Sequence, residues 1–136
     1  MNKYFVVNYK NNIASAYRKT GDYGQALTIY QSLIRYNINK NELLQNIGVT
    51  LLGTGNYREA VSYMKMVAYK NESKYNDLAR AYILLHEYDS ATFYLNVALQ
   101  IRENLQSTQK NIDHAYTLKY LGDINVLQGS LDKAIN

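Results

Sequence analysis

Residues 55–60 read Gly-Asn-Tyr-Arg-Glu-Ala, and residues 21–26 carry nearly the same hexapeptide, Gly-Asp-Tyr-Gly-Gln-Ala. Two further versions follow: His-Glu-Tyr-Asp-Ser-Ala at residues 86–91 and Gly-Ser-Leu-Asp-Lys-Ala at residues 129–134. A small residue stands seven positions before each hexapeptide, namely Ala14, Gly48, Ala79 and Gly122. The motif returns after 34, 31 and 43 residues, and such self-similarity indicates a repeat architecture.

Each repeat is predicted to be a pair of helices joined by a tight turn. Before the first hexapeptide, Ile13, Ala14 and Tyr17 share one face of a helix. Gly21 is expected to end that helix, because glycine enters the left-handed conformation at little steric cost. Ala26 is small because two helices must cross closely there. One such pair cannot bury its apolar stripe alone, so the repeats must stack.

The start of each second helix is predicted to carry a capping box. In the first repeat Asp22 would cap the helix and Gln25, three residues later, would complete the box. Asn56 and Glu59 stand at the same two places in the second repeat.

This set of positions resembles the tetratricopeptide repeat (TPR) family. The repeats run approximately over residues 7–40, 41–71, 72–114 and 115–136, the last being incomplete, and the third has the longer 42-residue type of spacing. The residues that carry the resemblance are Ala14, Gly21, Tyr23, Ala26, Gly48, Gly55, Tyr57, Ala60, Ala79, Tyr88, Ala91, Gly122 and Gly129. In the third repeat His86 replaces the turn glycine.

The resemblance implies an all-α fold, a right-handed superhelical solenoid of about 3.5 helix–turn–helix repeats. We expect seven full helices, the start of an eighth after Gly129, and a long second helix in the third repeat that reaches residues 102–106. The chain is expected to be a single domain over 1–136. Because such arrays normally end in a capping helix, which this sequence does not show, we also expect it to be a fragment of a longer protein. The alternative is a last helix covered by a partner.

The resemblance also places a concave groove along the first helix of each repeat. Eight positions become candidate binding residues: Asn11, Ser15, Gln45, Asn46, Asn76, Arg80, Tyr116 and Lys119. Asparagine amides can hold an extended peptide backbone, and the two cations could take a carboxylate. Ordinary solvated positions on amphipathic helices would give the same pattern. Of these residues only Asn46 matches the carboxylate clamp of TPR co-chaperones, so we do not expect that subtype.

Tyrosine accounts for 15 of the 136 residues and needs an explanation. We expect six tyrosines at repeat positions to be packing residues: Tyr17, Tyr23, Tyr30, Tyr57, Tyr82 and Tyr88. The remaining tyrosines are less constrained and could form a contact surface.

Composition argues against several classes of function. The chain has no cysteine and only two histidines, which are not spaced as metal ligands, so no metal, cofactor or catalytic site is expected. The net charge is +4, but no run of four basic residues occurs, which argues against nucleic-acid binding. No stretch is long and apolar enough to span a membrane, and no secretory signal is evident, so we expect a cytoplasmic protein.

The sequence therefore predicts a non-catalytic module that binds a peptide or helix in its concave groove, with possible self-association through the C-terminal helix. The alternative is a sensor or regulatory TPR segment of a longer bacterial signalling or transcription-regulating protein. A partner of protein or peptide nature is expected in either case.

Overall fold

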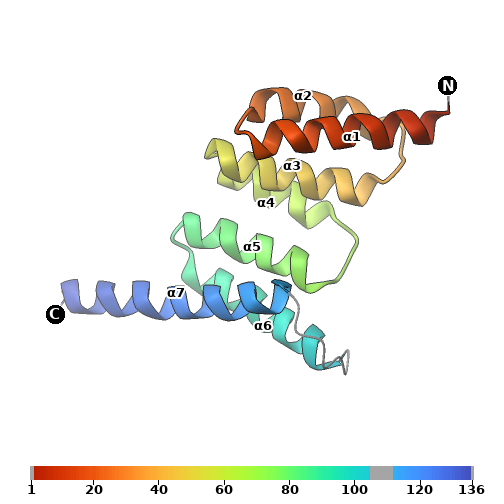
Figure 1. Ribbon diagram of the computed structural model, residues 1–136. Coiled ribbons are helices and arrows are strands. Elements are labelled where there is room, and N and C mark those ends of the chain that lie inside the picture. The colour runs from red at the N-terminus through yellow and green to blue at the C-terminus, as the bar shows by residue number, and fades with distance from the viewer. Residues whose placement is uncertain (1, 105–111, 136) are drawn as a thin grey trace. The chain divides into compact units, whose positions relative to one another are not determined.

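In the computed structural model, which describes residues 2–104 and 112–135, the chain forms α-helices and no described residue lies in a strand (Figure 1). The helices are α1 (Lys3–Lys19), α2 (Tyr23–Ile34), α3 (Lys40–Thr54), α4 (Tyr57–Met66), α5 (Glu72–Leu84), α6 (Tyr88–Asn104) and α7 (Ile112–Ile135). The expected all-α helical repeat is confirmed. None of the described helices combines the length and apolar character that crossing a bilayer requires.

The helices form two compact units, Met1–Tyr69 and Lys70–Asn136. In the first unit α1 packs on α2, α2 on α3, and α3 on α4. In the second unit α5 packs on α6, and α7 lies against both of them. The first three predicted repeats thus form the helix pairs α1–α2, α3–α4 and α5–α6.

Three turns have the same hydrogen-bonded geometry, as the repeated hexapeptide predicts. Gly21 and Gly55 have φ of +88° and +85°, and His86 adopts the same left-handed region at +60°. The residue that follows each of these donates its backbone N–H to the carbonyl oxygen five residues before it, at 2.9 to 3.0 Å. The pairs are Asp22 to Tyr17, Asn56 to Leu51 and Glu87 to Tyr82. These are Schellman motifs, which satisfy carbonyl groups at the end of a helix.

Small residues lie where the helices cross. Ala14, Ala26, Ala60, Ala79 and Ala91 are all fully buried. At Gly48, an added Cβ would come within 2.7 Å of Met64 Cγ and 3.3 Å of the Ala60 carbonyl oxygen. The predicted need for small residues at these five alanines and at Gly48 therefore follows directly from the packing.

The predicted capping boxes are wrong. Neither Asp22 nor Asn56 makes a side-chain cap hydrogen bond to its helix. Both side chains turn back to the preceding threonine instead: Thr20 Oγ1 donates to Asp22 Oδ2 at 3.4 Å, and Asn56 Nδ2 donates to Thr54 Oγ1 at 2.9 Å. The tight Schellman turn brings these side chains within reach of the helix that is ending.

The prediction of an eighth helix is also wrong. α7 runs without interruption through Gly129 to Ile135, so no turn forms at residues 129–131. An added Cβ at Gly122 or Gly129 would meet nothing within 4 Å, so neither glycine marks a close crossing. A glycine inside a helix costs only about 1 kcal/mol relative to alanine.

The long helix expected in the third repeat is present. α6 has 17 residues, compared with 12 in α2 and 10 in α4. It continues to Asn104, and residues 105 and 106 of the predicted extension lie outside the described residues.

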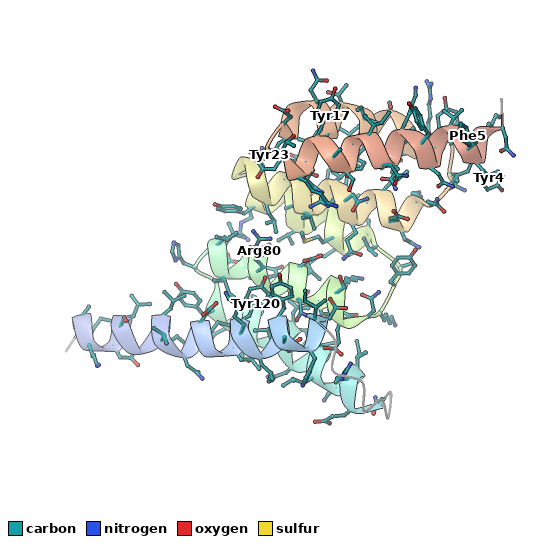
Figure 2. All side chains as sticks on the ribbon, viewed as in Figure 1. Tyr4, Phe5, Tyr17, Tyr23, Arg80 and Tyr120 are labelled. Carbon is teal, nitrogen blue, oxygen red and sulfur yellow. The ribbon has the colours of Figure 1, made fainter. Side chains whose placement is uncertain are left out.

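The tyrosines of the repeat positions divide into two groups. Tyr30 and Tyr82 are buried, and Tyr23, Tyr57 and Tyr88 are half-buried. The Tyr23 ring lies over the backbone of Gly53, where an added Cβ would be 2.5 Å from its Cζ atom. Tyr17 was expected to pack but is 37% exposed, which corrects that prediction. Figure 2 labels Tyr17 and Tyr23 in the first unit.

Candidate functional site

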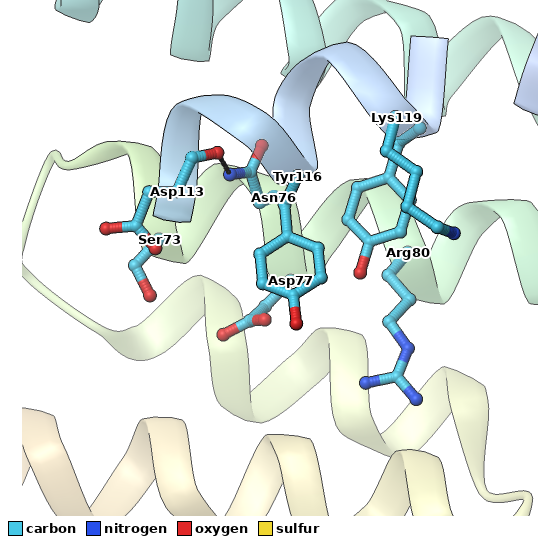
Figure 3. A pocket seen from close by; sticks show the side chains of 8 residues that line it. Ser73, Asn76, Asp77, Arg80, Asp113, Tyr116 and Lys119 are labelled. Atoms are coloured by element: carbon cyan, nitrogen blue, oxygen red, sulfur yellow. Dashed lines mark hydrogen bonds between the residues drawn. The ribbon is translucent and has the colours of Figure 1, made fainter. Parts of the chain in front are cut away.

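The strongest candidate site is a concave pocket of about 480 Å³ in the second unit, between α5 and α7. It is lined by four residues from each helix: Ser73, Asn76, Asp77 and Arg80 of α5, and Asp113, Tyr116, Lys119 and Tyr120 of α7 (Figure 3). Four of the eight predicted binding residues, Asn76, Arg80, Tyr116 and Lys119, are thus brought together at one place.

Helical spacing explains why these residues share one face. On α5, Ser73, Asp77 and Arg80 follow each other at intervals of four and three residues. On α7, Asp113, Tyr116 and Tyr120 do the same at intervals of three and four. Residues three or four apart lie on the same side of an α-helix, so both helices turn one polar row toward the pocket.

Two cations from different helices lie at one end of the pocket. Figure 3 shows Arg80 of α5 and Lys119 of α7 at this end, with Ser73 and Asp113 at the other. Lys119 Nζ donates to Asp123 Oδ2 at 3.0 Å on the surface of α7. This hydrogen bond and the negative charge of Asp123 raise the pKa of Lys119, which therefore stays protonated.

Tyrosine rings form an aromatic wall on the α7 side. The rings of Tyr116 and Tyr120 stack with centroids 5.8 Å apart, and Lys119 Nζ lies 5.4 Å from the centroid of Tyr120. Burial raises the pKa of the Tyr120 hydroxyl, with the positive charge of Arg80 opposing that effect. The hydroxyl is therefore neutral at physiological pH and can both donate and accept a hydrogen bond.

Asn76 belongs to the floor of the pocket rather than to its open surface. Its Nδ2 donates to the Asp113 carbonyl oxygen at 2.7 Å, and its Oδ1 accepts from Thr117 Oγ1 at 2.7 Å. The side chain is 3% exposed. Its amide thus joins α5 to α7 and fixes the spacing of the pocket walls.

The other four predicted binding residues lie in the first unit. Asn11 is buried and joins α1 to α3: its Nδ2 donates to Glu42 Oε1 at 2.8 Å, and its Oδ1 accepts from Asn46 Nδ2 at 3.2 Å. Ser15 Oγ lies 3.5 Å from an Arg18 guanidinium nitrogen, at the limit of a hydrogen bond. Gln45 is half-buried on α3. Asn11 and Asn76 occupy the fifth position of their repeats, and both tie neighbouring first helices together.

Sequence reasoning missed a buried polar cluster beneath the pocket. Glu72 is only 5% exposed, and its carboxylate lies 3.6 Å from Arg102 of α6 and 3.7 Å from His114 Nδ1 of α7. Thr117 Oγ1 is 3.4 Å from Glu72 Oε2 and also reaches Asn76. A glutamate in the first turn of a helix resembles a surface residue in sequence, and only the packing of three helices buries it.

Metal chemistry finds no support among the described residues, because no three His, Cys, Asp or Glu side chains come together there as a possible ligand group. The pocket offers charge of both signs, hydroxyl groups and aromatic surface, all of which can contact a segment of another molecule.

Comparison with known proteins agrees with the helical-repeat fold. The tetratricopeptide repeat family model matches residues 11–42, and a second tetratricopeptide repeat model matches residues 42–67. No curated protein matches the chain.

Solved structures with the same fold are distant in sequence. The TPR domain of Arabidopsis FLU is 18% identical with a TM-score of 0.67, over 76% of this chain and 99% of that one. The Sgt2 TPR domain from Aspergillus fumigatus is 13% identical with a TM-score of 0.77, over 96% and 83%. PcrH, solved in complex with the chaperone binding region of PopB, is 13% identical with a TM-score of 0.72, over 88% and 94%.

Proposed function

Because this chain is a tetratricopeptide-repeat protein, we propose that it is an interaction module that captures a peptide segment of a protein partner in the pocket between α5 and α7. The observation that carries the proposal is the convergence of Arg80, Tyr116 and Lys119, all chosen from their repeat positions, on one concave surface. PcrH, which has the same fold, holds a region of PopB, so this type of fold can accommodate a segment of another protein.

The interaction is proposed to be non-catalytic. The pocket is open and polar, and its titratable groups are spread along two helices. A general acid or base must lie within hydrogen-bonding reach of the group it serves, in a site that excludes water. An open groove does not exclude water, and it suits the reversible capture of an extended segment.

Site-specific photo-crosslinking tests the proposal. A photoreactive amino acid in place of Tyr116 should attach the partner in cells that contain the protein, because this ring lines the pocket. The matched control places the same amino acid at Phe93, an exposed aromatic position on α6 outside the pocket. Equal crosslinking from both positions, or crosslinking from Phe93 alone, would show that the partner is bound elsewhere.

A second candidate function is self-association through α7. The stripe of α7 that faces the core contains Thr117 and Ile124, both buried, and continues seven residues later to Leu131, which is 49% exposed. Ile135 is on the same side and is also exposed. We propose that a second copy of the chain covers this apolar continuation.

Oligomeric state tests self-association. Light scattering over a range of concentrations should show a dimer for the natural chain and a monomer for Leu131→Glu with Ile135→Glu. A monomer at every concentration of the natural chain would eliminate this candidate.

A further inference from the structure

Opposite charges lie at opposite ends of the pocket between α5 and α7, and this arrangement restricts the chemistry of a ligand more than the volume of the pocket does. The two helices run in the same direction: Asn76 of α5 bonds to Thr117 of α7, and Arg80 and Tyr120, four and three residues further along, line the same pocket. The cations Arg80 and Lys119 therefore gather at one end, and Asp113 lies with Ser73 at the other (Figure 3). Asp77 lies on α5 between these two ends.

The distance between the two ends follows from helix geometry. Seven residues separate Ser73 from Arg80 and six separate Asp113 from Lys119, which at 1.5 Å per residue corresponds to roughly 10 Å. An extended peptide advances about 3.3 Å per residue, so three residues of ligand span the pocket. The stacked rings of Tyr116 and Tyr120 provide apolar surface for the part in between.

Building on the proposed function, we propose that the pocket selects peptide segments that carry one acidic and one basic side chain about three residues apart. The acidic side chain lies between Arg80 and Lys119, and the basic one lies near Asp113 and Asp77. A segment with two like charges meets a like charge at one end, and a neutral segment leaves both ends without a counterpart.

The present contacts of these side chains are compatible with such a ligand. Lys119 is paired with Asp123, but both side chains are exposed, at 61% and 47%, and an exposed pair of this kind exchanges readily. Asp113 lies in the first turn of α7, where negative charge also favours the helix terminus. Replacing Asp113 would therefore change the stability of α7 whether or not Asp113 contacts a ligand, so only a binding measurement reports on its role in recognition.

Four blocked model peptides provide the probes. They are identical except at two positions three residues apart, which hold Glu and Lys, Glu and Glu, Lys and Lys, or Gln and Gln. Titration of the isotope-labelled full chain by NMR should show the Glu–Lys peptide binding at least about tenfold more tightly than the other three. Its chemical-shift changes should be confined to the pocket residues of α5 and α7. Undetectable or equal binding of all four peptides would overturn the inference.

Charge reversal supplies the matched control. Arg80→Glu with Lys119→Glu makes the pocket acidic throughout, and we expect its preference to switch to the Lys–Lys peptide. Lys40→Glu with Lys133→Glu makes the same change of net charge at exposed positions outside the pocket and should leave the preference unchanged. Arg80→Gln with Lys119→Gln should remove the preference for an acidic side chain at the Arg80 end, while Asp77 and Asp113 keep the preference for a basic side chain at the other end. A switch in the control, or none in the pocket variant, would contradict the proposal.

The two proposals fail in different ways. If the partner crosslinks at Tyr116 but the four peptides bind alike, the charge selection is wrong and peptide capture in the pocket stands. If the Glu–Lys peptide is selected but the partner crosslinks only outside the pocket, the proposed function is wrong.

Discussion

At the scale of single residues, glycine is required for different physical reasons at different positions. Gly21 and Gly55 stand in the left-handed conformation, whereas Gly48 is needed because α4 approaches the backbone of α3. Gly129 meets neither condition, since it lies inside α7 with open space around it. The sequence places all four at repeat positions and cannot tell these roles apart.

The substitution Gly48→Ala tests the close approach. Because its new Cβ would lie 2.7 Å from Met64 Cγ, we expect a loss of about 1–3 kcal/mol in the free energy of unfolding. Gly129→Ala is the matched control and should gain about 1 kcal/mol, the helix propensity of alanine over glycine. Urea denaturation measures both. A destabilised Gly129→Ala variant would indicate that a turn forms there after all.

His86 provides the opposite test. Its φ of +60° is uncommon for a residue with a side chain and costs roughly 1 kcal/mol. His86→Gly should therefore raise the free energy of unfolding by about that amount, although it removes an exposed contact between His86 Nδ1 and the Tyr88 hydroxyl at 3.0 Å. Thermal melts followed by circular dichroism measure the change. An unchanged or lower midpoint would mean that this contact stabilises the turn more than the strain destabilises it.

At the scale of the helices, polar side chains determine how first helices are joined. Asn11 links α1 to α3, and Asn76 with Thr117 links α5 to α7. These bonds lie at the buried edge of the groove, where an unsatisfied polar group is costly. We infer that the register of the pocket walls depends on Thr117 as much as on the apolar core.

Removal of the Thr117 hydroxyl tests this role. Thr117→Val leaves the buried Asn76 Oδ1 without its donor, and we expect a loss of about 1–3 kcal/mol. The matched control is Thr28→Val on α2, where the hydroxyl is exposed and bonds only to the Gly24 carbonyl, so the change should stay within about 0.5 kcal/mol. Chemical denaturation measures both variants. Equal losses in the free energy of unfolding would show that the buried hydrogen bond stabilises the fold no more than the exposed one.

The helices could be predicted from sequence because each has its own periodic stripe and a turn that ends it. The small buried alanines and the place of His86 at the third turn follow from aligning the repeats, and the structure adds that His86 is left-handed. Glu72 and its partners Arg102 and His114 could not be found, because they come from three helices and no local pattern links them. The caps failed for a related reason: the turn geometry, and not the residue types, decides where Asp22 and Asn56 point.

At the scale of the whole molecule, repeat positions identify which side chains share a groove but not which of them are open to a ligand. Four of the predicted binding residues meet in the pocket between α5 and α7, yet Asn76 is occupied in holding the helices. Asn11 is occupied in the same way in the first unit. The other four pocket residues are not among the eight candidates, and their place in the pocket depends on the pairing of α5 with α7: Ser73, Asp77, Asp113 and Tyr120.

The division into two compact units gives a prediction about unfolding. Ala60 of the first unit and Ala91 of the second stand at the same repeat position and are both fully buried. Replacing either by glutamate places a charge in a tight helix crossing and should destabilise its unit by several kcal/mol. Because each unit has its own buried core, Ala60→Glu should remove hydrogen-exchange protection from α1–α4 and leave that of α5–α7 largely intact.

Ala91→Glu is the reciprocal variant and should expose α5–α7 while α1–α4 keep their protection. Hydrogen exchange followed by mass spectrometry resolves the two units peptide by peptide, and the pocket lies wholly in the second. Ala60→Glu should therefore retain binding of the Glu–Lys peptide, whereas Ala91→Glu should lose it. If both variants lose protection along the whole chain, the repeats unfold as one cooperative array, and binding at the pocket depends on packing in the first unit as well.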